Sequence, residues 1–182
     1  YFLDNKTPLG EHSLSQFIVG VLNAFKGGFR RDDCLAVMKN YFYISNHDVS
    51  AFENVCLKNN LRFFGKPFNA INDEVAFAEQ VRQEFADFVE GFGFCHSDKV
   101  ENYVQKLKDF LQSDSTTNLV EQLCKQADST DDSLAKVSQQ VLEKIVSVLD
   151  TLNALFGDMF ANDQKFCDLL QMGLDAETIS II

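Results

Sequence analysis

The strongest helical pattern in the chain lies in residues 132–156, DSLAKVSQQVLEKIVSVLDTLNALF. Apolar side chains recur there every three or four residues, which is the spacing that places them on one face of an α-helix. Gly157 follows directly and ends the pattern, as glycine commonly does at a helix C-terminus. We therefore predict the longest helix of the protein at this place. Its apolar positions are Leu134, Val137, Val141, Leu142, Ile145, Val148, Leu149, Leu152 and Leu155.

The same spacing recurs towards the N-terminus. Residues 14–25 carry a second apolar stripe, which Gly27-Gly28 closes. Asp48 is a good N-cap for one helix, and another is predicted to start after Asn72 and to run to about Glu90. Shorter helices are predicted after Asp32, from Asp98, around residues 119–124 and over residues 163–172, with loops at 59–60 and 65–67.

Three of these boundaries rest on specific residues. Asp98 with Glu101 forms a capping-box-like start. Residues 113–117 are polar and are expected to interrupt the helical pattern, and Gly173 stands where a C′ glycine would end the last helix.

These patterns predict an all-α fold, one domain of about eight helices over residues 1–182. Only two prolines interrupt the chain, 46% of it is apolar, and it shows no repeat and no low-complexity linker. Residues 1–3 and 179–182 are apolar and strand-like. We expect these ends to join the sheet of a larger protein from which this segment comes, with processing or deliberate truncation as the alternative.

Composition excludes several classes of protein. The chain has 27 acids and 16 bases, a formal net charge of −11, and no apolar run approaching the roughly 20 residues of a membrane helix. Its five cysteines are odd in number, widely spaced and without a CxxC pair, which argues against a disulfide scaffold. They are Cys34, Cys56, Cys95, Cys124 and Cys167, and we predict reduced, mostly buried thiols in a cytoplasmic protein.

No arrangement of residues in the sequence indicates catalysis. Cys95-His96 is the one nucleophile–base candidate, but sequence neighbours seldom face each other, so a cysteine hydrolase is disfavoured. The three histidines lack metal-binding spacing, and acidic pairs such as Asp32-Asp33 suit the first turns of helices. No glycine-rich phosphate loop is present. We therefore predict no metal, no cofactor and no enzymatic activity for this segment.

Charge is distributed unevenly along the chain. Residues 1–66 hold eight bases against six acids, whereas the remaining residues hold eight bases against 21 acids. Only the N-terminal third therefore has the clustered bases that nucleic-acid binding requires, with Phe63-Phe64 nearby. A solvated helix face is the simpler interpretation of the same bases. The candidates for a surface facing DNA or a protein core are Arg30, Arg31, Lys39, Lys58, Arg62 and Lys66.

The order of several segments resembles a known family. YFLDNKTPLGEHSLSQFI, GFRRDDCLAVMKNYF and FENVCLKNNL, followed later by KVSQQVLEKIVSVLDTLNALFGD and KFCDLLQMGLDAETISII, are similar to the central region of AddB. AddB, also called RexB, is the B subunit of the bacterial ATP-dependent helicase/nuclease. The resemblance spans nearly the whole chain, is least distinctive over 66–118, and contains no catalytic signature. Ser13 departs from it, because the family usually has proline after the histidine that His12 matches.

The resemblance implies a helical insertion, the 2B-type domain, within a superfamily 1 helicase-like body. It implies a parent that acts with an AddA subunit on double-strand DNA breaks in recombinational repair. DNA is expected to bind the full complex, and the isolated acidic domain is expected to bind it weakly or not at all. ATP, magnesium and an iron–sulfur cluster would belong to parts of the parent outside this segment, and none of the five cysteines matches the cluster motif. No functional residue of the family maps onto this chain. The alternative is a stand-alone acidic helical module that binds a partner helix in an apolar groove.

Overall fold

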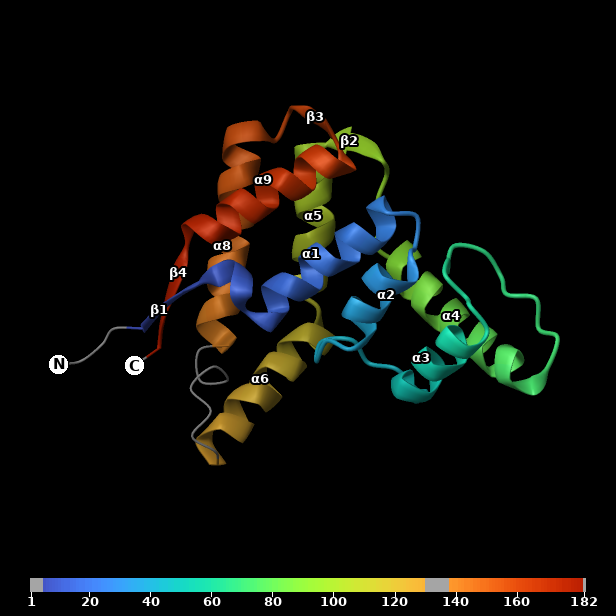
Figure 1. Cartoon of the computed structure of the whole chain (residues 1–182). Helices are drawn as coiled ribbons and strands as arrows, with labels where there is room; N and C mark the ends of the chain where they lie inside the picture. Colours follow the sequence, from blue (N-terminus) through green and yellow to red (C-terminus); the bar gives the residue numbers. More distant parts are fainter. Residues whose placement is uncertain (1–4, 130–137, 182) are drawn as a thin grey trace. The chain divides into compact units, whose positions relative to one another are not determined.

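The computed structural model describes residues 5–129 and 138–181. Within them the chain forms eight α-helices, one 3-10 turn and four short strands, so the predicted all-α fold is confirmed (Figure 1). The helices are α1 Ser13–Lys26, α2 Arg31–Met38, α3 Val49–Lys58, α4 Asp73–Glu90, α5 Val100–Leu111, α6 Asp114–Ser129, α8 Ser138–Phe156 and α9 Asp163–Ala176. The strands are β1 Asn5–Pro8, β2 Ser97–Lys99, β3 Phe160–Asn162 and β4 Thr178–Ile181, and the 3-10 turn is Leu9–Glu11.

The strands form two antiparallel pairs. β1 pairs with β4, with Asn5 opposite Ile181 and Pro8 opposite Thr178 (Figure 1). β2 pairs with β3, a pair that the sequence pattern does not predict, with Ser97 opposite Asn162. The C-terminal stretch expected to be strand-like therefore forms a strand, β4, up to Ile181. The strand that pairs with it, β1, belongs to the same chain. The other predicted strand-like stretch, residues 1–3, lies outside the described residues.

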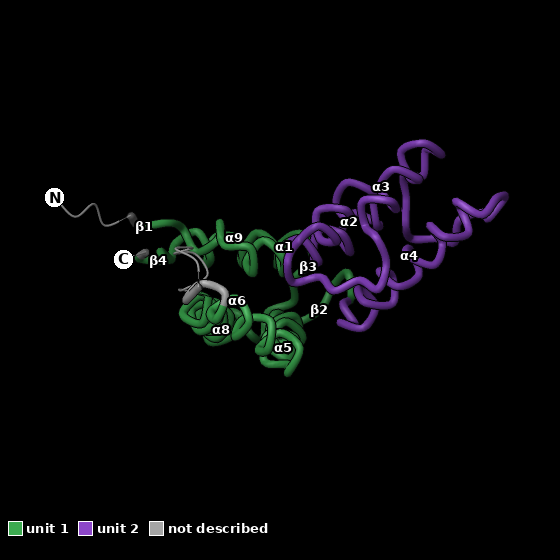
Figure 2. Tube along the Cα trace, turned by 90° about the horizontal axis from the view of Figure 1, so that it is seen from below, with its two compact units in different colours: residues 1–19, 95–182 green, residues 20–94 purple. Residues whose placement is uncertain are grey.

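Two compact units make up the chain (Figure 2). Unit 1 comprises Tyr1–Val19 and Cys95–Ile182, and unit 2 comprises Gly20–Phe94, so the division falls within α1. In unit 1, α5 and α9 each pack against α8, and the fully buried ring of Tyr103 stacks on Phe166 with 4.6 Å between ring centroids. The sequence patterns predict one domain over residues 1–182, and this remains a prediction.

Unit 2 has a core of phenylalanine rings from α3, from α4 and from the segment between them. Phe52, Phe64 and Phe85 are fully buried, and Phe52 meets Phe64 edge-on at 5.2 Å. Phe64 belongs to the segment between α3 and α4, which contains no helix. Burial of this ring fixes the segment to the helices, because a buried aromatic side chain contributes several times RT to folding.

The predicted N-cap at Asp48 and the predicted helix start after Asn72 are both confirmed by hydrogen bonds. The Asp48 carboxylate accepts from the amide of Ala51 at 3.0 Å and begins α3, and the Asn72 side chain accepts from the amide of Val75 at 2.9 Å and begins α4. Each bond satisfies one of the amides that the first turn of a helix leaves unpaired. The predicted start and end of α4, after Asn72 and near Glu90, are both correct.

The capping box predicted at Asp98 is wrong. Asp98 lies in β2, and α5 begins at Val100 with Lys99 as its N-cap and no side-chain capping bond. The first amides of α5 are satisfied by carbonyls distant in sequence, since Val100 donates to Met159 at 2.9 Å and Glu101 to Gly157 at 3.0 Å. The helix is capped by carbonyls from a distant part of the chain and not by a neighbouring side chain. A motif of neighbouring residues therefore predicts the wrong helix start.

Two predicted helix boundaries are corrected in the same way. α6 already starts at Asp114, because the Ser113 hydroxyl accepts from the Thr116 amide and the expected break shrinks to residues 112–113. α9 continues past Gly173 to Ala176. A Cβ atom at Gly173 would lie 2.8 Å from Cγ1 of Val148, so this glycine allows α9 to approach α8 closely instead of ending the helix.

The longest predicted helix is confirmed over its described part. α8 runs from Ser138 to Phe156 and ends before Gly157, as the stripe predicts. The predicted residues 132–137, with Leu134 and Val137, lie outside the described residues. α2 begins at Arg31, two residues earlier than expected, with Asp32 and Asp33 in its first turn, where carboxylates interact favourably with the helix dipole.

His12 gives the stability of the chain a specific pH dependence. Its side chain is 6% exposed, and its Nδ1 accepts the amide of Leu14 at 3.1 Å at the start of α1. Burial lowers the pKa of His12 below 6.5. The unfolded chain therefore binds a proton at higher pH than the folded chain does, so stability is fully present above pH 6.5 and is lost as the pH falls below it.

We expect His12→Asn to flatten this dependence. Asparagine can still cap α1 but does not titrate. The wild-type free energy of unfolding should fall by up to about 1.4 kcal/mol per pH unit more steeply below pH 6.5 than that of the variant. Urea unfolding at several pH values between 5 and 7.5 measures both slopes. Equal slopes for the two proteins would show that His12 is protonated in the folded state as readily as in the unfolded state.

Candidate nucleic-acid interface

A short antiparallel contact in unit 2 joins the start of α2 to the segment after α3. The amide of Arg31 donates to the carbonyl of Arg62 at 2.8 Å, and the amide of Phe64 donates to the carbonyl of Phe29 at 2.8 Å. Arg30 and Phe63 lie directly opposite each other in this bridge. The tight turn that brings the chain here includes Gly28 and Phe29, both with positive φ, of 71° and 62°. Arg30 and Arg31 at the start of α2 are thereby brought close to Arg62 of a distant segment.

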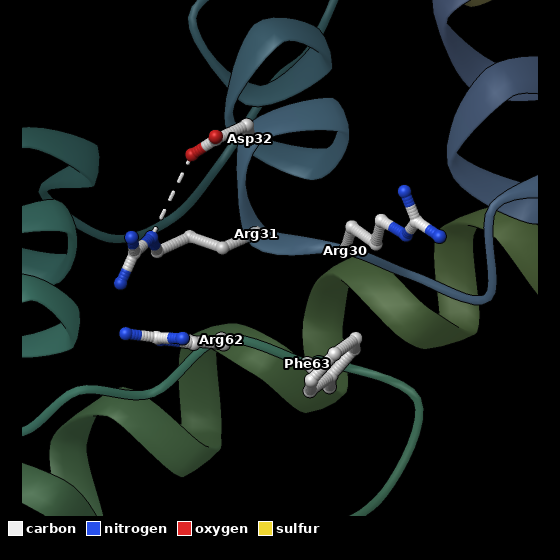
Figure 3. A pocket seen from close by; sticks show the side chains of 5 residues that line it. All are labelled: Arg30, Arg31, Asp32, Arg62 and Phe63. Atoms are coloured by element: carbon white, nitrogen blue, oxygen red, sulfur yellow. Dashed lines mark ion pairs between the residues drawn. The ribbon is translucent and has the colours of Figure 1, made fainter.

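These residues line one cavity of about 370 Å³ (Figure 3). Its lining residues are Arg30, Arg31, Asp32, Arg62 and Phe63, and we call it the arginine pocket. The guanidinium groups of Arg31 and Arg62 point to the same side, and that of Arg30 points the other way (Figure 3). With three guanidinium groups against one carboxylate, the pocket has the charge and the donors that suit phosphate or another anion.

Arg31 is the least satisfied polar group in the pocket. Its side chain is 20% exposed, and its Nε atom is buried with no hydrogen-bond partner. Nη1 reaches the carbonyl of Leu61 only at 3.5 Å, and the Asp32 carboxylate lies 3.7 Å from Nε while its side chain is 93% exposed. Burying a charged donor without full hydrogen bonding is costly. An anion in the pocket would relieve that cost.

Three of the six predicted basic residues belong to the pocket, and the others do not. Lys39 forms an ion pair with Glu53, and Nζ of Lys58 lies 3.0 Å from Oε1 of Glu74. Both lysines are therefore offset by a carboxylate of a neighbouring helix. Lys66 is exposed and does not line the pocket.

The pocket is held in place by an ion pair between buried Arg82 and half-buried Glu79, which the sequence pattern does not predict. Arg82 of α4 is 3% exposed, and its Nη1 donates to the carbonyl of Phe64 at 3.1 Å. Its Nε donates to both carboxylate oxygens of Glu79, at 2.6 and 2.8 Å, and Glu79 also accepts the amide of Phe68 at 3.0 Å. The pair is therefore hydrogen-bonded to two residues, Phe64 and Phe68, of the segment that carries Arg62. Three of the four arginines of the chain line the pocket, and the fourth, Arg82, holds the segment that carries Arg62.

Charge within unit 2 also favours this location. Unit 2 holds eight bases and ten acids, whereas unit 1 holds eight bases and 17 acids. An anionic polymer is therefore repelled less by unit 2 than by unit 1, and three of the eight bases of unit 2 line the arginine pocket.

The other predicted chemical residues are placed as follows. His96 Nδ1 lies 2.7 Å from Oδ2 of Asp163, and the amide of Asp163 donates to the carbonyl of His96. Asp163 is thus the hydrogen-bond partner of His96, although the two residues are 67 positions apart in the sequence. The thiol of Cys95 is exposed, and its carbonyl accepts the hydroxyl of Tyr103 at 2.6 Å. The described residues contain no group of three or more His, Cys, Asp and Glu side chains suited to a metal ion.

The five cysteines all lie in described positions and form no disulfide among themselves. Cys34, Cys56 and Cys167 are buried, as the prediction of buried thiols requires, Cys124 is half-buried, and Cys95 is an exception. Burial raises the pKa of Cys56 to about 12, and burial together with the nearby Asp33 also raises the pKa of Cys34. Thiols with such pKa values stay protonated near neutral pH and are poor nucleophiles.

Comparisons with known proteins add no identity. No family model matches the chain, and no curated protein matches it. In residues 5–129 and 138–181, no helix has both the length and the apolar character needed to cross a membrane.

Proposed function

We propose that this chain is a non-catalytic helical domain of an AddB-like subunit of an ATP-dependent helicase/exonuclease, and that the arginine pocket is where it faces DNA. The observation that carries the DNA-facing part is the convergence of Arg30, Arg31 and Arg62 on one cavity beside an exposed phenylalanine. The order of segments described above supports the family assignment. The parent subunit, in the cytoplasm of a bacterium, would act with AddA in the repair of double-strand breaks.

The pairing of β1 with β4 supports an inserted domain. Because Asn5 lies opposite Ile181, the chain enters and leaves unit 1 at neighbouring points. A domain inserted in a loop of another domain needs this arrangement, since the interrupted chain must resume close to where it stopped. ATP, magnesium and an iron–sulfur cluster would be bound elsewhere in the parent, and this domain would shape the path of the DNA.

The family assignment is tested by sequencing the native gene on both sides of codons 1 and 182. We expect one long reading frame, with a nucleotide-binding loop encoded upstream and a cysteine-bearing nuclease segment downstream. A start codon just before Tyr1 with a stop codon just after Ile182 would instead support the alternative, a stand-alone acidic module that binds a protein. The exposed apolar side chains Leu155, Phe160 and Met172 of unit 1 are the observation that favours this alternative.

The DNA-facing role is tested in the complete helicase/nuclease complex. We expect Arg31→Gln with Arg62→Gln to weaken the binding of DNA ends about tenfold at low salt, because two phosphate contacts are lost. Lys39→Gln with Lys58→Gln removes the same charge from lysines already paired with Glu53 and Glu74 and should change affinity less than about twofold. Equal effects of the two double variants would mean that the pocket does not face DNA.

A further inference from the structure

Arg31 and Arg62 form a like-charged pair that has no internal explanation. Their backbones are hydrogen-bonded at 2.8 Å, and their guanidinium groups point to the same side (Figure 3). Asn60 accepts from Nε of Arg62 at 2.8 Å, but an amide brings no compensating charge. The one carboxylate in the pocket, that of Asp32, is 93% exposed, so water screens it strongly. An anion with at least two oxygen atoms, such as a phosphate group, would accept hydrogen bonds from both guanidinium groups and balance their charge.

Phe63 adds a second kind of contact. Phe63 is 64% exposed although Phe64, the next residue, is fully buried in the core of unit 2. Because side chains alternate in an extended segment, burial of Phe64 presents Phe63 to the pocket side. An exposed aromatic face beside guanidinium groups suits the stacking of a nucleobase. Bases in a duplex are stacked on one another, so only an unpaired base can use this ring.

The size of the cavity limits what it holds. At about 370 Å³ it lies near the lower end of the range for small-molecule sites, and it is open to solvent at the surface of unit 2. A cavity of this size accepts one nucleotide unit of a longer strand. The bridge places Arg30 directly opposite Phe63, so a third guanidinium group stands beside a strand whose base lies on the ring.

We infer that the arginine pocket binds one unpaired nucleotide of single-stranded DNA. Arg31 and Arg62 hold its phosphate, Phe63 stacks on its base, and Arg30 attracts the continuing backbone. This inference rests on the proposed function for the choice of DNA as the polymer, and it adds that the site recognises single strands. A phosphorylated protein segment would use the arginines but not the ring, so the role of Phe63 separates the two ligands.

The test uses the complete 182-residue chain and three labelled probes. The probes are a short oligothymidylate, an abasic strand of the same length and charge, and a hairpin duplex, each followed by fluorescence anisotropy at low salt. We expect the oligothymidylate to bind more tightly than the other two. Phe63→Leu should weaken its binding about fivefold or more, the loss expected when one stacked base loses its aromatic partner, and should leave the abasic strand unaffected.

Salt dependence tests the arginines. Arg31→Gln with Arg62→Gln should reduce the slope of log affinity against log salt by about 0.7, since the two arginines hold one phosphate and each phosphate neutralised on a single strand contributes about 0.7. The matched controls are Phe160→Leu, which removes a ring that is 68% exposed in unit 1, and Lys39→Gln with Lys58→Gln. Both controls should bind like the wild type. Circular dichroism confirms that each variant is folded before it is compared.

Each other result overturns the inference. Equal affinity for the abasic strand and the oligothymidylate, or an unchanged affinity in Phe63→Leu, would mean that the pocket reads charge alone. Tighter binding of the duplex would mean that the pocket does not select unpaired bases. No binding of any probe by a folded chain would also overturn it. In all these cases the DNA-facing role is tested separately, by the effect of Arg31→Gln with Arg62→Gln on the affinity of the complete complex for DNA ends.

Discussion

Replacing Tyr103 by alanine is expected to lower the free energy of unfolding of the chain by about 3–5 kcal/mol, the cost of removing a large ring from a packed core. Tyr103 is fully buried in unit 1, and its ring lies nearly parallel to that of Phe166, at an interplanar angle of 10°. The stack joins α5 to α9, whose positions in the sequence are far apart. Urea unfolding followed by circular dichroism measures the loss.

Tyr103→Phe separates the ring from the hydroxyl. Burial and the nearby carboxylates of Asp163 and Asp98 raise the pKa of Tyr103 to about 12, so the hydroxyl stays protonated and donates to the carbonyl of Cys95. Losing this bond should cost about 1 kcal/mol, because the ring and its stacking remain. If Tyr103→Ala cost no more than Tyr103→Phe, the stack with Phe166 would contribute nothing to stability.

Helices with a strong local pattern could be predicted well. α4 has its predicted start after Asn72, its predicted apolar face and its predicted end near Glu90, because all three are properties of residues close in sequence. The start of α5 could not, since the groups that cap it are the carbonyls of Gly157 and Met159. The strands β2 and β3 belong to the same arrangement and have three residues each, too short for an alternating pattern to be visible.

The basic residues of the pocket could be named from the sequence, but their grouping could not. Charge counting treats Lys39 and Arg31 alike, whereas the structure pairs the lysine with Glu53 and leaves the arginine without a full set of partners. That difference depends on which helices are neighbours, which spacing along one segment does not reveal. Arg82 was missed although a signal was available. It lies four residues after Ala78 and three before Phe85, on the apolar face of α4, where an arginine must have a partner.

Arg82→Met should lower the free energy of unfolding by about 3 kcal/mol, near the lower end of the range for breaking a buried ion pair. The lower end applies because the Glu79 side chain is 23% exposed and can regain some water. The variant leaves the Glu79 carboxylate without its guanidinium partner and the carbonyl of Phe64 without a donor. Lys58→Met is the matched control, because it breaks a pair whose side chains are 69% and 47% exposed and should cost less than about 1 kcal/mol.

The loss in Arg82→Met should depend on pH. Burial acts to raise the pKa of Glu79, but the hydrogen bonds from Arg82 and from the amide of Phe68 outweigh it, so the pKa lies below 4.5. A carboxylate with a lowered pKa stabilises the fold above its unfolded value and loses that contribution as the pH falls. The difference in stability between wild type and Arg82→Met should therefore shrink below pH 4.5. A difference independent of pH would show that Arg82 acts through packing alone.

A second substitution shows whether the unpaired charge is the cause. Arg82→Met with Glu79→Gln removes both charges, while the new amide oxygen can still accept the amide of Phe68, so most of the lost stability should return. The carbonyl of Phe64 remains without its donor in the double variant, and the segment carrying Arg62 and Phe63 stays less firmly held. Recovery of stability together with weakened oligothymidylate binding would identify Arg82 as a positioning residue of the arginine pocket. Recovery of both would mean that Phe64 alone, through its buried ring, keeps the pocket in place.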